Sequence, residues 1–452
     1  MKPADCREFY ERRDPRTTQY LGHPLDGALP VRVVVGDAEG SSRAGQVLVL
    51  SLLNQLARIH RSVTLELHDR RTPLLVAGPA GASTLEEAAV TLMESIDPCG
   101  KFECSIAPIE GEVVVAVTSL NCVKADVFAG ASGAIGMIDT CAIPSDLMSP
   151  GALRGAAVAS CLAASAALRV HLGRAIAPLR LSAWNYLAGA DASAGPDSLV
   201  RGELGRVLLI GAGAVSSALA YWLQWLELDA HWVVVDPDRV ELHNTNRGLL
   251  FTAADAGWPA GTARSKAVVV ANALRGTPFT SWYDDCPAVQ DQCDLALCLA
   301  NARSVRTELA QRNLPVVLHA TTGGEWQAAL HRHIAGRDDC PRCRTGDSRA
   351  ATFACSESKL GVGGAERSPD AALPFLSAAA GLMLATALER LAAGELSHGD
   401  TNVWRWYLDS AGRGGVLPGR AKCQSDCSVW LPRHLRRQLH ASSRWAHLDA
   451  GA

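Results

Sequence analysis

A strand, a glycine turn and a helix follow one another in the second half of the chain, and this feature constrains the fold most. The apolar run Arg206–Ile210 is typical of a buried parallel strand. Gly211 and Gly213 lie in the tight turn that follows, and helical periodicity runs from residue 217 to residue 226. A second apolar strand, Trp232–Asp236, ends in an acidic residue. These elements predict a βαβ unit and therefore an α/β fold.

The first half of the chain repeats this plan in a degraded form. Strands are predicted at residues 31–35, 63–67, 112–117 and 133–138, and helices at residues 46–59 and 155–172. The turn Gly36–Gly40 lacks the closely spaced glycines of a phosphate-binding loop and contains two acidic residues, so it would repel an anion. We interpret this half as a Rossmann-like domain that has lost its nucleotide site, with an unrelated α/β domain as the alternative.

A linker separates the two halves. Residues 189–205 are rich in Gly, Ala, Ser and Pro, as is typical of connecting segments. Beyond the βαβ unit, strands are predicted at residues 294–299 and 314–319, with a helix at residues 304–313 between them. We therefore expect two domains, residues 1–200 and residues 201–452.

The glycine turn of the second half predicts a nucleotide site. Closely spaced glycines let backbone N–H groups approach a phosphate at the positive end of a helix. Gly211 and Gly213 suit this role, although Ser216 replaces the third glycine of the usual pattern. Asp236 can accept hydrogen bonds from ribose hydroxyls. These features fit an NAD site as well as an ATP site.

The residues after Asp236 favour ATP. Arg247 closes the run Asn244-Thr-Asn246-Arg247, and Lys266 opens a later helix. Cleavage of ATP to AMP and pyrophosphate shifts negative charge within the triphosphate, and these two cations can stabilise it. Hydride transfer needs no such cationic set beside its cofactor.

This segment resembles the E1-like (ThiF/MoeB/ubiquitin-activating) adenylating enzymes, from residue 206 to about residue 393. The shared pattern is an acid pair, a Val-Glu, an Asn-x-Asn-Arg and a downstream lysine. The resemblance implies two Rossmann-like ThiF-type domains in tandem, the first inactive, and ATP with Mg²⁺ as cofactors. It implies the following nucleotide-binding residues: Gly211, Gly213, Asp236, Asp238, Asn244, Asn246, Arg247, Lys266 and Asn301.

The resemblance also implies a substrate and partners. The substrate is the C-terminal carboxylate of a ubiquitin-like protein that ends in glycine, and the partners are an E2-like acceptor and a second copy in a homodimer. Family members take an arginine from the partner domain into the ATP site, and Arg12 or Arg13 is the candidate here. The fused layout is similar to that of prokaryotic E1s, some of which serve antiphage defence, which is an analogy alone.

Two departures from the family pattern affect the nucleotide site. Gly248 stands where the family usually has glutamine, and Ala300 stands where it has a magnesium-binding aspartate. Magnesium is then expected on Asp238 or Asp294, or on Asn301 through water. A chain that binds a ubiquitin-like partner without turnover is one alternative function. Others are sulfur-carrier activation, peptide modification, dehydration of a tRNA base and NAD-dependent oxidoreduction.

Five of the 14 cysteines are candidate functional residues. Two pairs have metal-ligand spacing, C-x2-C and the looser C-x3-C, and the resemblance puts a structural zinc on them; the pairs are Cys340, Cys343, Cys423 and Cys427. Cys355 lies between the pairs, where thioester-forming relatives carry a reactive cysteine, and Lys359 can favour its thiolate. An inert loop cysteine is the alternative for Cys355.

Composition excludes some classes of partner. The formal net charge is -3, which gives no support for nucleic acid or an anionic membrane surface as a partner. The most apolar stretches, near residues 155–170 and 371–391, are short and rich in alanine, so we expect buried helices rather than membrane spans. With no apolar run at its N-terminus, the protein is expected in the cytoplasm.

Overall fold

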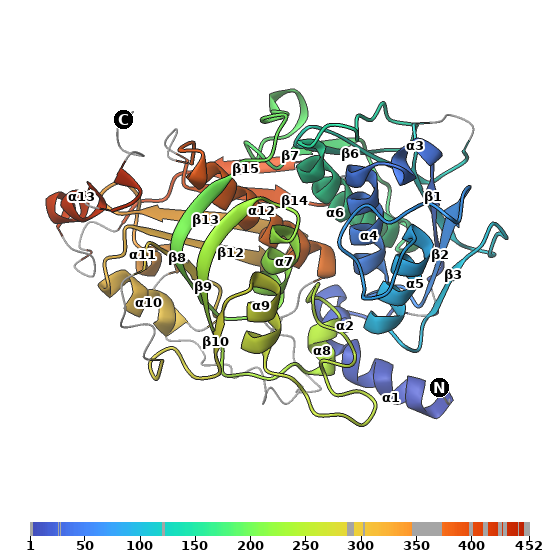
Figure 1. Ribbon diagram of the computed structural model, residues 1–452, viewed down its shortest axis with the longest axis horizontal. Helices are drawn as coiled ribbons and strands as arrows, with labels where there is room; N and C mark the ends of the chain where they lie inside the picture. Colours follow the sequence, from blue (N-terminus) through green and yellow to red (C-terminus); the bar gives the residue numbers. More distant parts are fainter. Residues whose placement is uncertain are drawn as a thin grey trace.

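The computed structural model contains two α/β units, each built around one sheet (Figure 1). It describes residues 3–25, 27, 29–119, 123–286, 293–301, 303–345, 373–396, 401–409, 415–423, 427, 432–441 and 443–446.

The first sheet has the strand order β3-β2-β1-β4-β5-β6-β7. Strands β1 to β5 are parallel, whereas β6 and β7 are antiparallel. Its elements are α1 (Pro3–Arg13), α2 (Pro15–Leu21), β1 (Val31–Val35), α3 (Asp37–Gly40), α4 (Arg43–Leu56), β2 (Ser62–Leu67), α5 (Leu85–Ile96), β3 (Lys101–Cys104), β4 (Val113–Val117), β5 (Val127–Ser132), β6 (Ile135–Asp139), α6 (Ala152–His171) and β7 (Leu179–Ser182).

The second sheet has the order β10-β9-β8-β11-β12-β13-β14-β15. Strands β8 to β12 are parallel and β13 to β15 are antiparallel. Its elements are β8 (Gly202–Ile210), α7 (Ala214–Leu223), β9 (Leu228–Val235), α8 (Leu242–Thr245), α9 (Lys266–Leu274), β10 (Thr277–Phe279), β11 (Leu295–Cys298), α10 (Arg303–Gln311), β12 (Val316–Gly323), β13 (Gln327–Ile334), α11 (Pro341–Thr345), α12 (Pro374–Ala392), β14 (Val403–Tyr407), β15 (Gly415–Gly419) and α13 (Arg433–Ala441).

The two sheets share one plan, in which five parallel strands in the same relative order are followed by antiparallel strands. The predicted fold class, two Rossmann-like α/β domains in tandem, is therefore confirmed. The first sheet ends at Ser182 and the second begins at Gly202, while the domain limits 1–200 and 201–452 stay a prediction.

A layer of helices lies between the sheets: α4 and α6 cover the first sheet, and α7 and α12 cover the second (Figure 1). Residues of both halves join one continuous hydrophobic core. The long helices α6 and α12 are apolar enough to span a membrane, but 94% of the most apolar window of each is buried inside the fold. Their apolar composition is therefore explained by burial between the sheets.

Some local structure differs from the sequence prediction. The segment after β1, expected as a loop, contains the short helix α3. Helix α7 begins at Ala214, three residues earlier than expected, because Gly213 already acts as its N-cap. The antiparallel strands β13 to β15 and the helices α1 and α2 were not predicted.

An ion pair inside the helix layer joins the halves. Arg154 of α6 binds Glu389 of α12 through two hydrogen bonds of 2.8 Å, and both side chains are fully buried. Arg154 also donates to the carbonyls of Pro196 and Ser198 in the linker. This guanidinium therefore ties both domains and the segment between them.

We expect Arg154→Ala to lower the free energy of unfolding by about 3–5 kcal/mol, because the Glu389 carboxylate would stay buried without its partner. Urea denaturation followed by tryptophan fluorescence measures this change. Arg201→Ala removes an exposed ion pair with Glu227 and should leave the denaturation curve unchanged. Equal stability of the two variants would contradict the role given to Arg154.

Candidate active site

The glycine turn after β8 opens toward the N-terminus of α7. Gly211 has a φ of 88°, and a Cβ there would lie 2.6 Å from the backbone nitrogen of Ala300, so only glycine fits. A Cβ at Gly213 would meet no atom within 4 Å. The turn thus packs tightly on one side and leaves open space beside the first residue of the helix, as a bound phosphate requires.

Asp236 holds this turn in place. Its carboxylate accepts hydrogen bonds from the amides of Ala212 at 2.6 Å and Asp238 at 2.8 Å. Burial raises the pKa of the carboxyl group, and the nearby positive charge of Lys266 opposes this shift. A carboxylate offers about four acceptor positions, so Asp236 can bind ribose hydroxyls while it supports the turn.

Lys266 stands at the first position of α9 and reaches back to the acid pair. Its Nζ lies 2.9 Å from a carboxylate oxygen of Asp238, and its amide donates to the Asp238 carbonyl at 2.9 Å. The Lys266 side chain is only 3% exposed, whereas that of Asp238 is 28% exposed. The lysine is therefore held in one position close to the glycine turn.

Positive charges gather around α8. His243 lies 3.3 Å from Glu241 and lowers the pKa of that carboxyl group, with smaller effects from Lys266 and Arg16. Burial lowers the pKa of His243, and Arg247 and Arg16 add to that shift. Three cations from separate parts of the chain, Arg16, Arg247 and Lys266, therefore act on one small region, which we call the cationic cluster.

The two asparagines of the Asn-x-Asn-Arg motif have different positions. Asn244 accepts a hydrogen bond from the Glu241 amide at 2.9 Å and so caps α8. Asn246 is fully buried, donates to the Thr17 hydroxyl at 3.0 Å, and its Oδ1 has no hydrogen-bond partner among the described residues. Of the pair, Asn246 is the one with a buried acceptor available to a ligand.

The arginines of the N-terminal segment lie in three different environments. Arg13 is fully buried and binds Asp14 and Asp97, each at 2.6 Å, inside the first half. Arg12 has an exposed side chain beside Glu8. Arg16 of α2, 6% exposed, is the one that joins the cationic cluster. The sequence signal was Asp14-Pro15, a typical helix start, which turns the chain after α1.

Helix α2, which carries Arg16, is held at the carboxyl end of β12 in the second sheet. The Tyr20 hydroxyl donates to the carbonyl of Gly323, at the end of β12, at 2.8 Å and accepts from the amide of Trp326 at 3.0 Å. Phe9 of α1 packs against Leu242 and Ala253 of the second half. The N-terminal helices therefore contribute directly to the candidate nucleotide site.

The proposed magnesium ligands lie at opposite ends of the second sheet. Asp294 precedes β11 and accepts from the amide of Arg206 at 2.8 Å, at the end of the sheet opposite to Asp236. That position removes Asp294 from the candidates. Asp238 and Asn301 remain at the carboxyl edge, where Ala300 follows β11.

The first half carries a carboxylate where the second half has its glycine turn. Glu39, 7% exposed, accepts from the amide of Ser119 at 3.0 Å, beyond the end of β4. A Cβ on Gly36 would lie 2.2 Å from a Glu39 oxygen. The carboxylate thus fills the space at the end of β1 and would repel a phosphate there.

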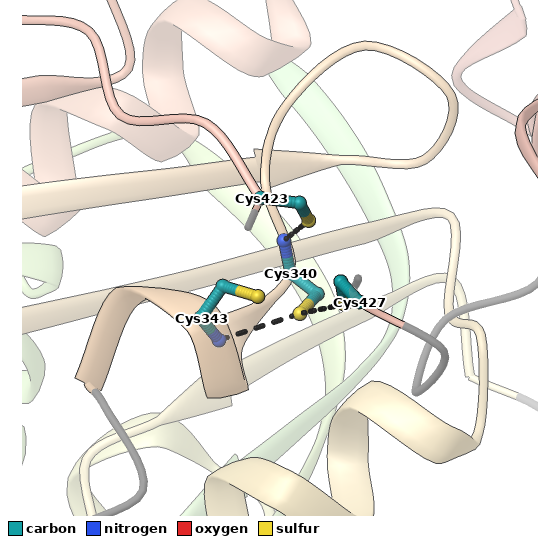
Figure 2. A group of neighbouring side chains, drawn as sticks. All are labelled: Cys340, Cys343, Cys423 and Cys427. Atoms are coloured by element: carbon teal, nitrogen blue, oxygen red, sulfur yellow. Dashed lines mark hydrogen bonds between the residues drawn. The ribbon is translucent and has the colours of Figure 1, made fainter. Parts of the chain in front are cut away.

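The four clustered cysteines come together although 83 residues separate Cys340 from Cys423 (Figure 2). All four ligand atoms lie within 4.8 Å of one another. The Cys340 amide donates to the Cys423 sulfur at 3.1 Å, and the pKa of the Cys423 thiol is lowered to about 5, chiefly by a hydrogen bond from the Cys340 side chain. A closed set of four thiolates is compatible with structural zinc. Cys355 lies outside the described residues.

Comparisons with known proteins agree with this geometry. Residues 192–402 match the model of the ThiF family. Over 161 residues the chain is 27% identical to a protein of Saccharomyces cerevisiae described as "Ubiquitin-activating enzyme E1-like", which covers 33% of this chain and 24% of that protein. The chain thus spans about a quarter of the length of this curated relative.

Solved structures of E. coli MccB are also similar to the chain. The structure with AMPCPP and MccA has a TM-score of 0.38 and 13% identity, over 50% of this chain and 66% of that chain. The structure with ATP has a TM-score of 0.37 and 14% identity, over 50% of this chain and 65% of that chain.

The paired sheets and the glycine turn define a Rossmann-like nucleotide-binding class. The match over residues 192–402 indicates that the second half of the chain contains a ThiF-type domain, the domain type of the E1-like (ThiF/MoeB-type) adenylating enzymes.

We expect one zinc ion per chain, bound by the four cysteines. Elemental analysis of protein purified without added metal measures the content, and Cys340→Ser should lose the ion because a tetrahedral site then lacks one thiolate. Cys286→Ser changes a buried cysteine outside the cluster and should keep the zinc. A folded wild-type sample with less than about a tenth of an equivalent would contradict the assignment.

Proposed function

We propose that the chain activates the C-terminal carboxylate of a ubiquitin-like protein by adenylation. The observation that supports this most strongly is the cationic cluster of Arg16, Arg247 and Lys266 around α8, of which Lys266 also acts on Asp236 beside the glycine turn at the N-terminus of α7. A triphosphate matches that arrangement, because its charge faces both the helix N-terminus and the three cations. The proposed location is the cytoplasm.

In this proposal the carboxylate oxygen attacks the α-phosphorus of ATP, the bond between the α-phosphorus and the bridging oxygen breaks, and pyrophosphate leaves. Arg247 and Lys266 stabilise the charge that develops on the leaving group, and Arg16 adds a third cation. Asp236 orients the ribose, and the Asn246 Oδ1 accepts a hydrogen bond from the nucleotide. Asp238 and Asn301 would hold Mg²⁺, which neutralises part of the phosphate charge.

The first half is proposed as an inactive adenylation domain. Its turn holds the Glu39 carboxylate where a phosphate would bind. It nevertheless supplies helices to the active half, so its role is support. We therefore propose one nucleotide per chain and a layout similar to that of prokaryotic E1s.

After adenylation, we propose that the Cys355 thiolate attacks the acyl carbon, the bond from that carbon to the phosphate oxygen breaks, and AMP leaves. The resulting thioester would then pass the acyl group to an E2-like protein, which frees the Cys355 thiol. The acyl-adenylate is a strong electrophile, and a thiolate is a good nucleophile at neutral pH. Cys298 is unsuited to this step, because burial in β11 raises the pKa of its thiol to about 11.

A second candidate function is binding of a ubiquitin-like partner without turnover. Ala300 favours it, because this residue stands where the family carries a magnesium-binding aspartate. Sulfur-carrier activation and peptide modification use the same adenylation and differ only in the carboxylate.

We expect the wild type to catalyse pyrophosphate exchange with ATP and its carboxylate partner. Arg247→Ala and Lys266→Ala should abolish exchange, and Arg16→Ala should lower it about 100-fold through the loss of one charge-stabilising contact. Arg12→Ala, an exposed change, is the control and should keep full activity. Asp236→Ala should mainly weaken nucleotide binding.

Two outcomes of this experiment would contradict the proposal. Tight partner binding without any exchange would support the non-catalytic alternative. Binding of NAD in place of ATP would support an oxidoreductase.

Cys355→Ser should spare adenylation and remove only a covalent adduct that a thiol reductant cleaves, because the nucleotide site is built from other residues. A non-reducing gel with ATP and the partner measures the adduct. Cys298→Ser is the control and should keep it. An adduct that persists in Cys355→Ser would rule out this cysteine as the acceptor.

A further inference from the structure

Arg58 belongs to the first half but binds the backbone of the second. It follows α4, and its guanidinium donates to the carbonyls of Thr245, of Leu249 at 2.8 Å and of Phe251 at 3.0 Å. A fourth hydrogen bond, from Nε to Asn54 at 3.0 Å, orients the guanidinium. The contacted residues bracket Asn246 and Arg247, and we call residues 245–251 the motif loop.

Other contacts hold the same loop. Asn54 donates to the Leu249 carbonyl at 3.2 Å. The Leu250 amide donates to the Ser217 hydroxyl of α7 at 2.8 Å. The motif loop is therefore fixed between α7 of its own half and the end of α4 from the other half, and Arg58 makes the largest number of these contacts.

The environment of Arg58 is unusual for a cation. The side chain is 1% exposed, and its four recorded acceptors are all neutral oxygens. Burial lowers the pKa of the guanidinium to about 9. The charge of Asp255 opposes this shift, but no carboxylate accepts a hydrogen bond from Arg58 among the described residues, and a buried cation held only by neutral oxygens is costly. The arrangement therefore indicates that the geometry of the guanidinium is needed here. A planar guanidinium spans three carbonyls at once, which an ammonium group cannot do.

We propose that Arg58 is a positioning residue for the adenylation proposed above, on which this inference rests. Fixing the carbonyls of Thr245, Leu249 and Phe251 fixes the peptide planes around Asn246 and Arg247, and hence the direction in which these two side chains point. Arg58 thus acts on the ATP site through the backbone of the active half, without touching the nucleotide.

Arg154→Lys is a matched control for Arg58→Lys. Each arginine is 1% exposed, makes four hydrogen bonds and joins the two halves, but Arg154 binds Glu389 and the linker instead of the motif loop. A loss of stability alone should therefore affect both variants, whereas an effect on Arg247 should follow only from Arg58→Lys.

The experiment measures the affinity for ATP by calorimetry in the full chain, in the wild-type and Arg247→Ala backgrounds. Arg58→Lys should weaken ATP binding about tenfold in the wild-type background through misplacement of Arg247. In the Arg247→Ala background, Arg58→Lys should weaken ATP binding only about twofold, because the arginine side chain that Arg58 positions is already absent. Arg154→Lys should change the affinity for ATP by the same small factor in the wild-type and Arg247→Ala backgrounds.

Hydrogen exchange supplies a second readout that does not depend on ATP. Peptides that cover residues 245–251 should exchange faster in Arg58→Lys than in Arg154→Lys, even when the two variants unfold at the same denaturant concentration. Equal hydrogen exchange in the two variants, or an equal loss of ATP affinity from Arg58→Lys in both backgrounds, would overturn the inference about Arg58. The proposed function would still stand in that case, provided that the wild type binds ATP. A wild type that binds no ATP would overturn both.

Discussion

The buried ion pair between Arg154 and Glu389 lies in the helix layer on which the rest of the molecule depends. With α4, α6, α7 and α12 packed between two sheets, the hydrophobic core of one half continues into the other. Because that interior is apolar, the pair gains strength from its low dielectric and would be costly to break. The layer fixes the halves relative to each other, so groups of the first half can reach the second.

The duplicated plan shows how the same fold can carry or lose an anion site. Both halves place a turn after the first parallel strand of the sheet, where a phosphate meets a helix N-terminus. In the second half, Gly211 permits the tight turn and Gly213 leaves that space open. In the first half, Glu39 fills it with a negative charge of its own. Similar backbones therefore have opposite electrostatic properties at the same point.

Much of the fold could be predicted because a buried parallel strand can be recognised from its own short run of residues. The runs at β1, β2, β4, β8 and β11 are short, apolar and rich in branched residues, and each was predicted within a few residues of its limits. Strands β13 to β15 were missed, since histidine and arginine interrupt the apolar pattern of β13, arginine interrupts that of β14, and β15 is short and contains glycine and proline. Their pairing depends on neighbours in the sheet, and no local period records it.

The sequence alone determined the α/β class, the glycine turn, the acid after β9, the Asn-x-Asn-Arg motif and the spacing of the four cysteines. Each of these is a pattern within a few consecutive residues, governed by local backbone geometry. Tertiary structure decided that Arg16 joins the cationic cluster while Arg13 pairs with Asp97, and that Arg58 binds a loop far along the chain. Those contacts arise from the packing of helices between two sheets. Nothing in the sequence around an arginine shows which distant residue it will contact.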